Sequence, residues 1–321
     1  MNEIKQNSDL KSELFSEIKK LKKEKNAVIL AHNYQVPEIQ DIADYVGDSL
    51  GLSIEAGKTN ADVIVFCGVY FMAETASIIS PQKKVLIPDL EAGCSLAASI
   101  NAEQLINWKA EHSDSVVVSY INTTADIKSE SDYCVTSSNA VKIVNSISDD
   151  KEILFLPDKY LGRYIEQVTG RKMTIWDGAC HVHEKIGEIV FSEIKNEHPS
   201  AEFLIHPECG CSTSCLVRSQ NDPNGDKMKI FSTEGMLRYA EKSESKEFVI
   251  ATETGILHRM KKLSPEKDFY PVSEKSVCEY MKMITLEKLY DSLLYEQYEV
   301  RVDDQIAFKA MKPIQRMLSI H

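Results

Sequence analysis

The sequence predicts an α/β fold made of three repeated units, each with a parallel sheet flanked by helices. The first observation is that Cys94, Cys180 and Cys278 occupy the same place in three consecutive copies of one pattern, 86 and 98 residues apart. The second is that short apolar runs with few charges, such as AVILAH, VVVSY and FLIH, recur along the chain, as in strands buried on both faces. Because equivalent positions of repeated units can face a common axis, we expect a central active site.

The elements of each copy follow one order. Each copy opens with an apolar run that ends in polar groups: AVILAHNYQ at 27–35, SVVVSYINTT at 115–124 and AEFLIHPEC at 201–209. A Ser/Thr group at the head of a predicted helix follows, in GDSLGLSIEAG, VTSSNAVKIV and FSTEGMLRYA. A second apolar run comes next, and a third run leads to the cysteine. The pattern therefore predicts three strands in each unit, alternating with helices.

The repeat also sets the expected domain boundaries. We expect a first α/β repeat at 1–107, which includes an N-terminal amphipathic helix and is joined by the C-terminal tail 290–321. The second repeat is expected at 108–190 and the third at 191–289. The third copy is longer because the segment CGCSTSCLVRSQNDPNG is inserted after its first strand.

Composition limits the kinds of partner. A net charge of −12 argues against nucleic acid or an anionic membrane, although a locally positive pocket can still bind small anionic substrates. No apolar run approaches the roughly 20 residues that a membrane-spanning helix needs. The charged, heptad-like N-terminal segment is unlike a signal peptide, so a cytoplasmic location is expected. The eight cysteines are then expected to be metal ligands or core thiols rather than disulfides.

The three repeated cysteines are the first candidate site, as ligands of a [4Fe–4S] cluster. Such a cluster usually takes four thiolates, so three would leave one iron not bound by cysteine. That iron would be open to act as a Lewis acid. The alternative, three small buried thiols, stays open, although matched positions in a repeat strengthen the cluster hypothesis.

The segment CGCSTSC is the densest group of thiols, with Cys209, Cys211 and Cys215 within seven residues. Zinc or a redox-active pair is possible, but the segment lacks the paired C-x-x-C of zinc ribbons. We favour a loop at the mouth of the site whose thiols do not act together. Cys67 and Cys134 are expected to be small packing residues.

Hydroxyl and imidazole groups form the remaining candidates. Ser49, Ser137 with Thr136, and Ser232 with Thr233 lie near predicted helix N-termini, where they can cap the helix or help to bind an anion. Their matched positions favour a shared anion site. His32, His183 and His206 recur beside the cysteines and hydroxyls, and histidine can act as acid or base near neutral pH. Glu208, which follows His206 and Pro207 in the HPE motif, is the best single carboxylate for general acid–base catalysis.

Taken together, the motifs AHNYQ, GDS, FCGVYFMAETA, YINTTADIK, CVTSSNA, WDGACHVHE, HPEC and ATETGILHRM resemble the quinolinate synthase family. The resemblance runs from about residue 25 to 320 in order and spacing. It implies three pseudo-threefold-related α/β/α domains around a central [4Fe–4S] cluster. It also implies the condensation of iminosuccinate (iminoaspartate) with dihydroxyacetone phosphate to quinolinate, with release of phosphate and water, in NAD biosynthesis.

Residue roles follow from the resemblance, motif by motif. Cys94, Cys180 and Cys278 would hold the cluster, and Tyr34, Glu208, His183 and His206 would be catalytic. The substrates would be bound by His32, Ser49, Tyr120, Asn122, Ser137, His206, Glu208 and Thr233. An L-aspartate oxidase or dehydrogenase is the expected source of the labile imine. The CGCSTSC passage is longer and richer in cysteine than the family often has, which leaves open whether one of its thiols modulates the site.

Two other functions remain as alternatives. A different cluster-dependent hydro-lyase would share the open iron but lack the hydroxyls that bind phosphate. A non-catalytic iron–sulfur or zinc sensor would use CGCSTSC, but the acidic charge and the lack of an appended binding module count against it.

Overall fold

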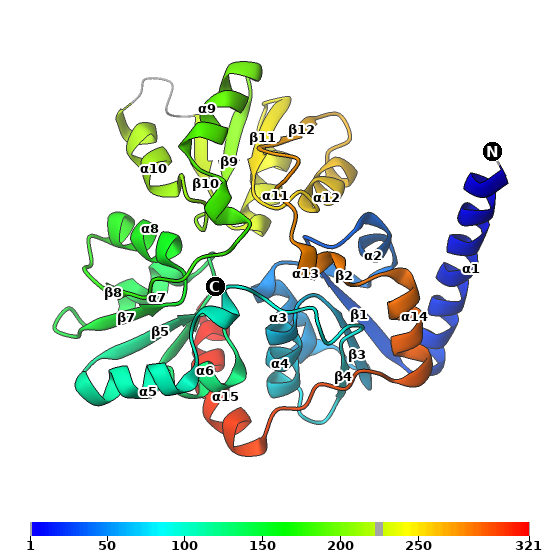
Figure 1. Ribbon diagram of the computed structural model, residues 1–321, viewed down its shortest axis with the longest axis horizontal. Helices are drawn as coiled ribbons and strands as arrows, with labels where there is room; N and C mark the ends of the chain where they lie inside the picture. Colours follow the sequence, from blue (N-terminus) through cyan, green and yellow to red (C-terminus); the bar gives the residue numbers. More distant parts are fainter. Residues whose placement is uncertain (1, 222–226, 321) are drawn as a thin grey trace. The chain divides into compact units, whose positions relative to one another are not determined.

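The structure is a computed structural model that describes residues 2–221 and 227–320 (Figure 1). Residues 222–225, which belong to the predicted insertion, and the next residue, 226, lie outside the described part. The chain forms two compact units, Met1–Cys94 with Glu279–Asp304, and Ser95–Cys278 with Gln305–His321. None of the described helices is both long and apolar enough to cross a membrane.

Unit 1 contains one parallel four-stranded sheet in the order β2-β1-β3-β4. Its strands are β1 (Ala27–His32), β2 (Tyr45–Gly47), β3 (Val63–Cys67) and β4 (Lys84–Leu86). The helices are α1 (Asn2–Glu24), α2 (Pro37–Ile42), α3 (Ser49–Lys58), α4 (Tyr70–Ile79), α13 (Glu279–Lys282) and α14 (Leu286–Tyr295). Every residue of β3 is buried, as its uninterrupted apolar sequence predicts.

Unit 2 contains two further parallel sheets with the same strand order. The first is β6-β5-β7-β8, with β5 (Val116–Tyr120), β6 (Tyr133–Val135), β7 (Ile153–Leu156) and β8 (Thr174–Ile175). The second is β10-β9-β11-β12, with β9 (Glu202–Ile205), β10 (Met228–Ile230), β11 (Glu247–Ala251) and β12 (Asp268–Pro271). The α/β class and three parallel sheets flanked by helices are therefore confirmed.

The helices of unit 2 follow the same alternation. The first sheet is accompanied by η1 (Ala97–Ser99), α5 (Ala102–Glu111), α6 (Ala125–Ser129), α7 (Ala140–Ser146) and α8 (Lys159–Thr169). The second sheet is accompanied by η2 (His183–Lys185), which precedes it in the chain, and by α9 (Glu188–Glu197), α10 (Ser212–Asn221), α11 (Thr233–Lys242) and α12 (Ile256–Leu263). Leu105 of α5 and Ile127 of α6 pack with Val117 and Leu154 of the first sheet, whereas Phe191 of α9 packs with the second.

The expectation of three strands in each repeat was wrong, because each sheet has four. The additional strands β2, β6 and β10 have only three residues each. A run of three residues is too short for a periodic pattern to stand out in the sequence. Two of the three are preceded by an aspartate, Asp44 or Asp132, whose carboxylate accepts a hydrogen bond from the first strand of its sheet.

The predicted C-terminal tail divides between the units. Residues 290–304 belong to unit 1 with α14, whereas α15 (Asp304–Ser319) belongs, apart from its first residue, to unit 2. Asn139 Nδ2 donates to the carbonyl oxygens of Met317 and Ile320, at 3.0 and 2.8 Å, which anchors the end of this helix beside α7. The predicted boundaries near 107 and 190 stay predictions.

Hydrogen bonds repeat with the sheets. In each copy, the backbone N–H of a residue just after the third strand donates to the carbonyl of the residue two before the repeated cysteine. The pairs are Tyr70–Ala92 at 2.8 Å, Lys159–Gly178 at 2.9 Å and Thr254–Ser276 at 2.9 Å. The three cysteines therefore hold equivalent positions in the fold, as the sequence repeat predicts.

A buried or half-buried cation marks the end of one helix in each repeat. Lys83, Arg171 and Lys267 stand shortly before the last strand of their sheets and donate to carbonyl oxygens at the C-terminal ends of α3, α7 and α11, respectively. Cations at this end of a helix satisfy free carbonyls and complement the helix dipole.

Candidate active site

The strand order predicts where a ligand would bind. In each sheet the first strand, β1, β5 or β9, lies between the second and third strands, so the chain changes direction beside it. In open parallel sheets, ligands bind at the carboxyl ends of the strands at such a point. Tyr120 ends β5, and His206 and Glu208 directly follow β9. All three belong to unit 2.

Glu208 lies at the centre of a buried group of polar side chains. The hydroxyl of Tyr120 donates a hydrogen bond to Glu208 Oε1. His183 Nδ1 is 3.2 Å from Glu208 Oε2, and His206 Nδ1 is 3.7 Å from Oε1. All four side chains are buried. A carboxylate withdrawn from water in this way needs such partners, because an unpaired buried charge is costly.

A second ring of contacts orients the two imidazoles. His183 Nε2 lies 2.8 Å from Thr252 Oγ1, just after β11, and His206 Nε2 lies 3.4 Å from Ser137 Oγ. The two imidazole rings stack with their centroids 4.9 Å apart. Each ring is therefore held between Glu208 on one side and a hydroxyl on the other, which fixes its orientation.

Some buried polar atoms of this region have no hydrogen-bond partner among the described residues. Asn122 Oδ1 and His206 Nδ1 are among them. Buried polar atoms in folded proteins are nearly always paired, so unpaired ones near a candidate site suggest a role in binding.

The pKa values of Glu208 and His206 indicate that Glu208 is charged and His206 is neutral at neutral pH. Burial on its own would raise the pKa of Glu208, but His183, His206 and the Tyr120 hydroxyl outweigh it and lower the pKa to about 2. Burial lowers the pKa of His206 to about 4, against the opposing effect of Glu208. At neutral pH the imidazole of His206 is therefore neutral and lies beside the charged carboxylate of Glu208.

Asp158 is a second buried carboxyl in the electrostatic neighbourhood of Glu208. It follows β7 and caps α8, where its Oδ1 accepts a hydrogen bond from Leu161 N at 2.7 Å. Its Oδ2 has no hydrogen-bond partner among the described residues. Burial, and then repulsion by Glu208, raise the pKa of Asp158 well above its usual range. Two carboxyls whose pKa values are pushed apart can serve as acid and base.

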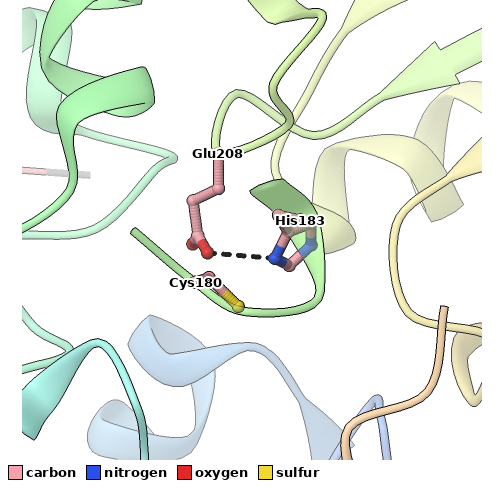
Figure 2. A group of neighbouring side chains, drawn as sticks. All are labelled: Cys180, His183 and Glu208. Carbon is pink, nitrogen blue, oxygen red and sulfur yellow. Dashed lines mark ion pairs between the residues drawn. The ribbon is translucent and has the colours of Figure 1, made fainter. Parts of the chain in front are cut away.

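A thiol joins this group. One ligand atom each from Cys180, His183 and Glu208 lie within 4.8 Å of one another, close enough to hold a metal ion (Figure 2). Figure 2 shows the three side chains pointing toward one another, with Cys180 and His183 on one segment and Glu208 on the loop after β9. Unit 2 therefore contains a possible metal-binding group.

Exposure sorts the eight cysteines into two sets. Three are partly exposed, and the other five are buried; the partly exposed ones are Cys94, Cys180 and Cys278. The three predicted cluster ligands are therefore the cysteines whose side chains the surrounding residues cover least. Cys67 and Cys134 are buried, as expected of packing residues.

The cysteines of CGCSTSC lie in a hydrophobic core, not in a loop at the mouth of a site as we expected. Cys209, Cys211 and Cys215 pack with Phe191 and Phe203 of the second sheet of unit 2. Burial raises the pKa of Cys209 to about 12, and that of Cys211 also rises, chiefly through its hydrogen bond to Cys215. Protonated, enclosed thiols are poor metal ligands and poor nucleophiles.

The remaining predicted residues of unit 1 also lie at the carboxyl end of their sheet. His32 ends β1, and its Nδ1 accepts a hydrogen bond from Tyr34 N at 3.2 Å. The two rings make an edge-to-face contact at 4.5 Å. Ser49 is the first residue of α3, which is capped by Asp48.

The predicted hydroxyls occupy similar but not identical places at their helices. Thr233 is the first residue of α11, and Ser232 caps that helix. Ser137 instead lies before Asn139, the residue at the N-cap of α7. The expectation of a hydroxyl near each helix N-terminus is therefore confirmed, although Ser137 lies three residues before the first residue of α7.

Comparison with known proteins decides the family. The family model of "Quinolinate synthetase A protein" matches residues 16–319. The chain belongs to this family. It is 53% identical over 307 residues to a quinolinate synthase of Thermus thermophilus, covering 96% of this chain and 97% of the relative.

Two further relatives carry the same name. A quinolinate synthase of Pyrobaculum aerophilum is 53% identical over 304 residues, covering 95% of this chain and 98% of the relative. A quinolinate synthase of Mycobacterium tuberculosis is 49% identical over 307 residues, covering 95% and 88%, respectively. The family similarity thus extends over both units and both parts of the predicted site.

Three polar residues of this region were not singled out from the sequence. Asp158 follows β7, and Thr252 and Glu253 follow β11. These strands are the third of the two sheets of unit 2, and each pairs with the first strand of its sheet, β5 or β9. The position of the three residues after an apolar run was a usable signal, because EILFLPD and EFVIATETG both end in polar residues.

Proposed function

We propose that the protein is a quinolinate synthase, which condenses iminosuccinate with dihydroxyacetone phosphate and releases one phosphate and two waters. These substrates and products balance in atoms and charge without an oxidant. The reaction requires proton transfers and the expulsion of oxygen leaving groups. An enzyme for it needs donors for the anionic groups and acids and bases at the reacting carbons.

The observation that carries the proposal is the buried group around Glu208 in a chain that belongs to this family. His206, neutral at neutral pH, is suited to accept a proton, and Tyr120 and Asp158 are suited to donate one. Asn122 Oδ1 remains available to a substrate. Because the group is buried, its hydrogen bonds act without competition from bulk water.

The proposal assigns the cofactor to the repeated cysteines. Cys94, Cys180 and Cys278 would hold a [4Fe–4S] cluster with one iron not bound by cysteine. Their partial exposure and equivalent positions in the repeats support this assignment. When bound, such a cluster supplies a Lewis acid that can polarise an oxygen of the substrate.

The remaining residues of the proposed site bind and orient the substrates. Tyr34, Glu208, His183 and His206 would move protons, and hydroxyls and helix N-termini would bind the carboxylates and the phosphate. The substrate-binding set comprises His32, Ser49, Tyr120, Asn122, Ser137, His206, Glu208 and Thr233. An L-aspartate oxidase or dehydrogenase would supply the imine. The eight cysteines form no disulfide in the described structure, which suits a cytoplasmic location.

The test is an anaerobic assay of the purified protein with dihydroxyacetone phosphate and iminosuccinate made in place by an aspartate oxidase. We expect quinolinate and inorganic phosphate to form in equal amounts. Glu208→Gln should lower turnover on the order of 10²–10⁴-fold, as for loss of a positioned acid or base. The matched control is Glu202→Gln, at the opposite end of β9, where the carboxylate only accepts a hydrogen bond from Ser243.

Two outcomes would contradict the proposal. Turnover without release of phosphate from dihydroxyacetone phosphate would favour a different cluster-dependent hydro-lyase. A Glu208→Gln protein that keeps its iron and wild-type turnover would remove Glu208 from the catalytic residues.

A further inference from the structure

The segment after β11, Thr252–Thr254, contacts two parts of the proposed site at once. Thr252 Oγ1 lies 2.8 Å from His183 Nε2. The next residue, Glu253, is fully buried and turns its carboxylate toward the segment that carries Cys278. Thr254 N donates to the carbonyl of Ser276 at 2.9 Å. Three successive residues thus link an imidazole of the site to a proposed cluster ligand, all within unit 2.

Both carboxylate oxygens of Glu253 accept backbone hydrogen bonds. Oε1 accepts from Cys278 N at 3.1 Å, and Oε2 accepts from Gly255 N at 2.7 Å. The carboxylate therefore connects the turn after β11 directly to the backbone of the cysteine. Hydrogen bonds from backbone N–H groups to a buried carboxylate are among the stronger ones in proteins.

The residue that corresponds to Glu253 differs between the three repeats. All three have the backbone hydrogen bond to the residue two before the cysteine. The residue equivalent to Glu253 is Asp158 in the second repeat and Val69 in the first, each directly before the residue that donates this bond. Asp158 is one methylene shorter, and its Oδ2 has no partner among the described residues. In the third repeat, the side chain at this position bonds to the backbone N–H of the cysteine itself.

We propose that Glu253 is a positioning residue that fixes the backbone of Cys278 before any metal binds. Residues 276–278 lie in an irregular segment between β12 and α13, where no ladder of strand hydrogen bonds can hold the chain. Val277, beside the cysteine, is exposed. The Glu253 carboxylate restrains the backbone at the cysteine itself, so the thiol of Cys278 is held ready as a ligand. The inference rests on the proposed function, because it takes Cys278 as a cluster ligand.

Glutamine at position 253 tests the inference, because its amide offers one acceptor oxygen where the carboxylate offers two. The first readout is amide hydrogen exchange of the metal-free protein. We expect the Cys278 amide to be protected in the wild type and to exchange about tenfold faster in Glu253→Gln, the effect of losing one hydrogen bond. The Cys180 amide in the same molecule should keep its rate.

The second readout is the rate at which a chelator removes iron from the loaded protein under anaerobic conditions. Glu253→Gln should lose iron about tenfold faster than the wild type, and Glu253→Asp should resemble it because the shorter side chain does not span both N–H groups. The matched control is Glu247→Gln, on the same strand, where the carboxylate only accepts a hydrogen bond from Ser200. It should behave as the wild type does.

The outcomes separate this inference from the proposed function. A wild-type Cys278 amide that exchanges as fast as in an unfolded chain would overturn the inference, even if the variants fail to fold. Equal acceleration at Cys180 and Cys278 would also overturn it, since it would show general loosening. A wild-type protein without iron, or a Cys278→Ala protein that keeps its iron, would instead count against the proposed cluster.

Discussion

Replacing Tyr120 with phenylalanine removes one hydroxyl from the buried Glu208 group and leaves the ring in place. The hydroxyl donates to Glu208 Oε1, and both side chains are at most 5% exposed, so water cannot replace the lost donor. A hydrogen bond to a charged group is worth about 1.5–3 kcal/mol. We therefore expect Tyr120→Phe to lower the free energy of unfolding of unit 2 by about that amount at neutral pH. The pKa of Glu208 should rise by roughly one to two units.

The assay is urea unfolding followed by tryptophan fluorescence. The chain has two tryptophans, Trp108 and Trp176, and both belong to unit 2, so the signal reports on the unit that contains the substitution. A double-mutant cycle with Tyr120→Phe and Glu208→Gln isolates the interaction between the two side chains. We expect a coupling energy of about 1–3 kcal/mol.

The matched control is Tyr164→Phe on α8, also in unit 2. Tyr164 is half-buried, and burial alone raises the pKa of its hydroxyl. Its substitution should change stability by less than about 0.5 kcal/mol. A coupling energy near zero between Tyr120 and Glu208, or a Tyr164→Phe variant as destabilised as Tyr120→Phe, would refute the reasoning.

Three further predictions concern two buried titratable side chains and the thiols. Because burial and Glu208 raise the pKa of Asp158 in the folded state, the contribution of Asp158 to stability should fall as pH rises above about 4. Asp158→Asn keeps a cap oxygen and should gain stability over the wild type as pH rises, a gain that disappears in acid; equal pH profiles in urea unfolding would contradict this. Because burial lowers the pKa of His206 to about 4, the unfolded chain binds the extra proton first, and stability should drop by about 3 kcal/mol between roughly pH 6.5 and 4. His206→Gln should lose this dependence, and a variant that keeps it would show another group to be responsible. Finally, an alkylating reagent at pH 8 should label Cys94, Cys180 and Cys278 of the metal-free native protein and spare the five buried cysteines until urea unfolds the chain; early labelling of Cys209, mapped by mass spectrometry, would contradict its place in the core.

Much of the fold follows from features that a sequence displays directly. The apolar runs at 27–32, 116–120 and 202–205 became the first strands of the three sheets, because uninterrupted apolar runs of this length suit strands covered on both faces. The three-residue strands could not be predicted this way. They are set by pairing with a neighbouring strand, which is a tertiary contact and leaves no periodic signal.

Some residues of the candidate site could likewise be predicted from the sequence, and others could not. Tyr120 and Glu208 could be predicted to lie at sheet edges because both follow strongly apolar strands. Asp158 and Glu253 also follow apolar strands, but their burial and the particular N–H groups from which their carboxylates accept hydrogen bonds could not be predicted from the sequence. The cysteines of CGCSTSC were misplaced for the same reason, because close spacing along the chain does not reveal that the thiols point into a core.

The assignment of the cofactor is the central claim, and anaerobic iron and sulfide analysis tests it most directly. The wild type should hold about four iron and four sulfide per chain, as one [4Fe–4S] cluster requires. Cys94→Ala, Cys180→Ala and Cys278→Ala should each lose them, whereas alanine at Cys209, Cys211 or Cys215 should leave the content unchanged in folded protein. If the iron instead followed the CGCSTSC cysteines, the assignment to the three repeated cysteines would be wrong.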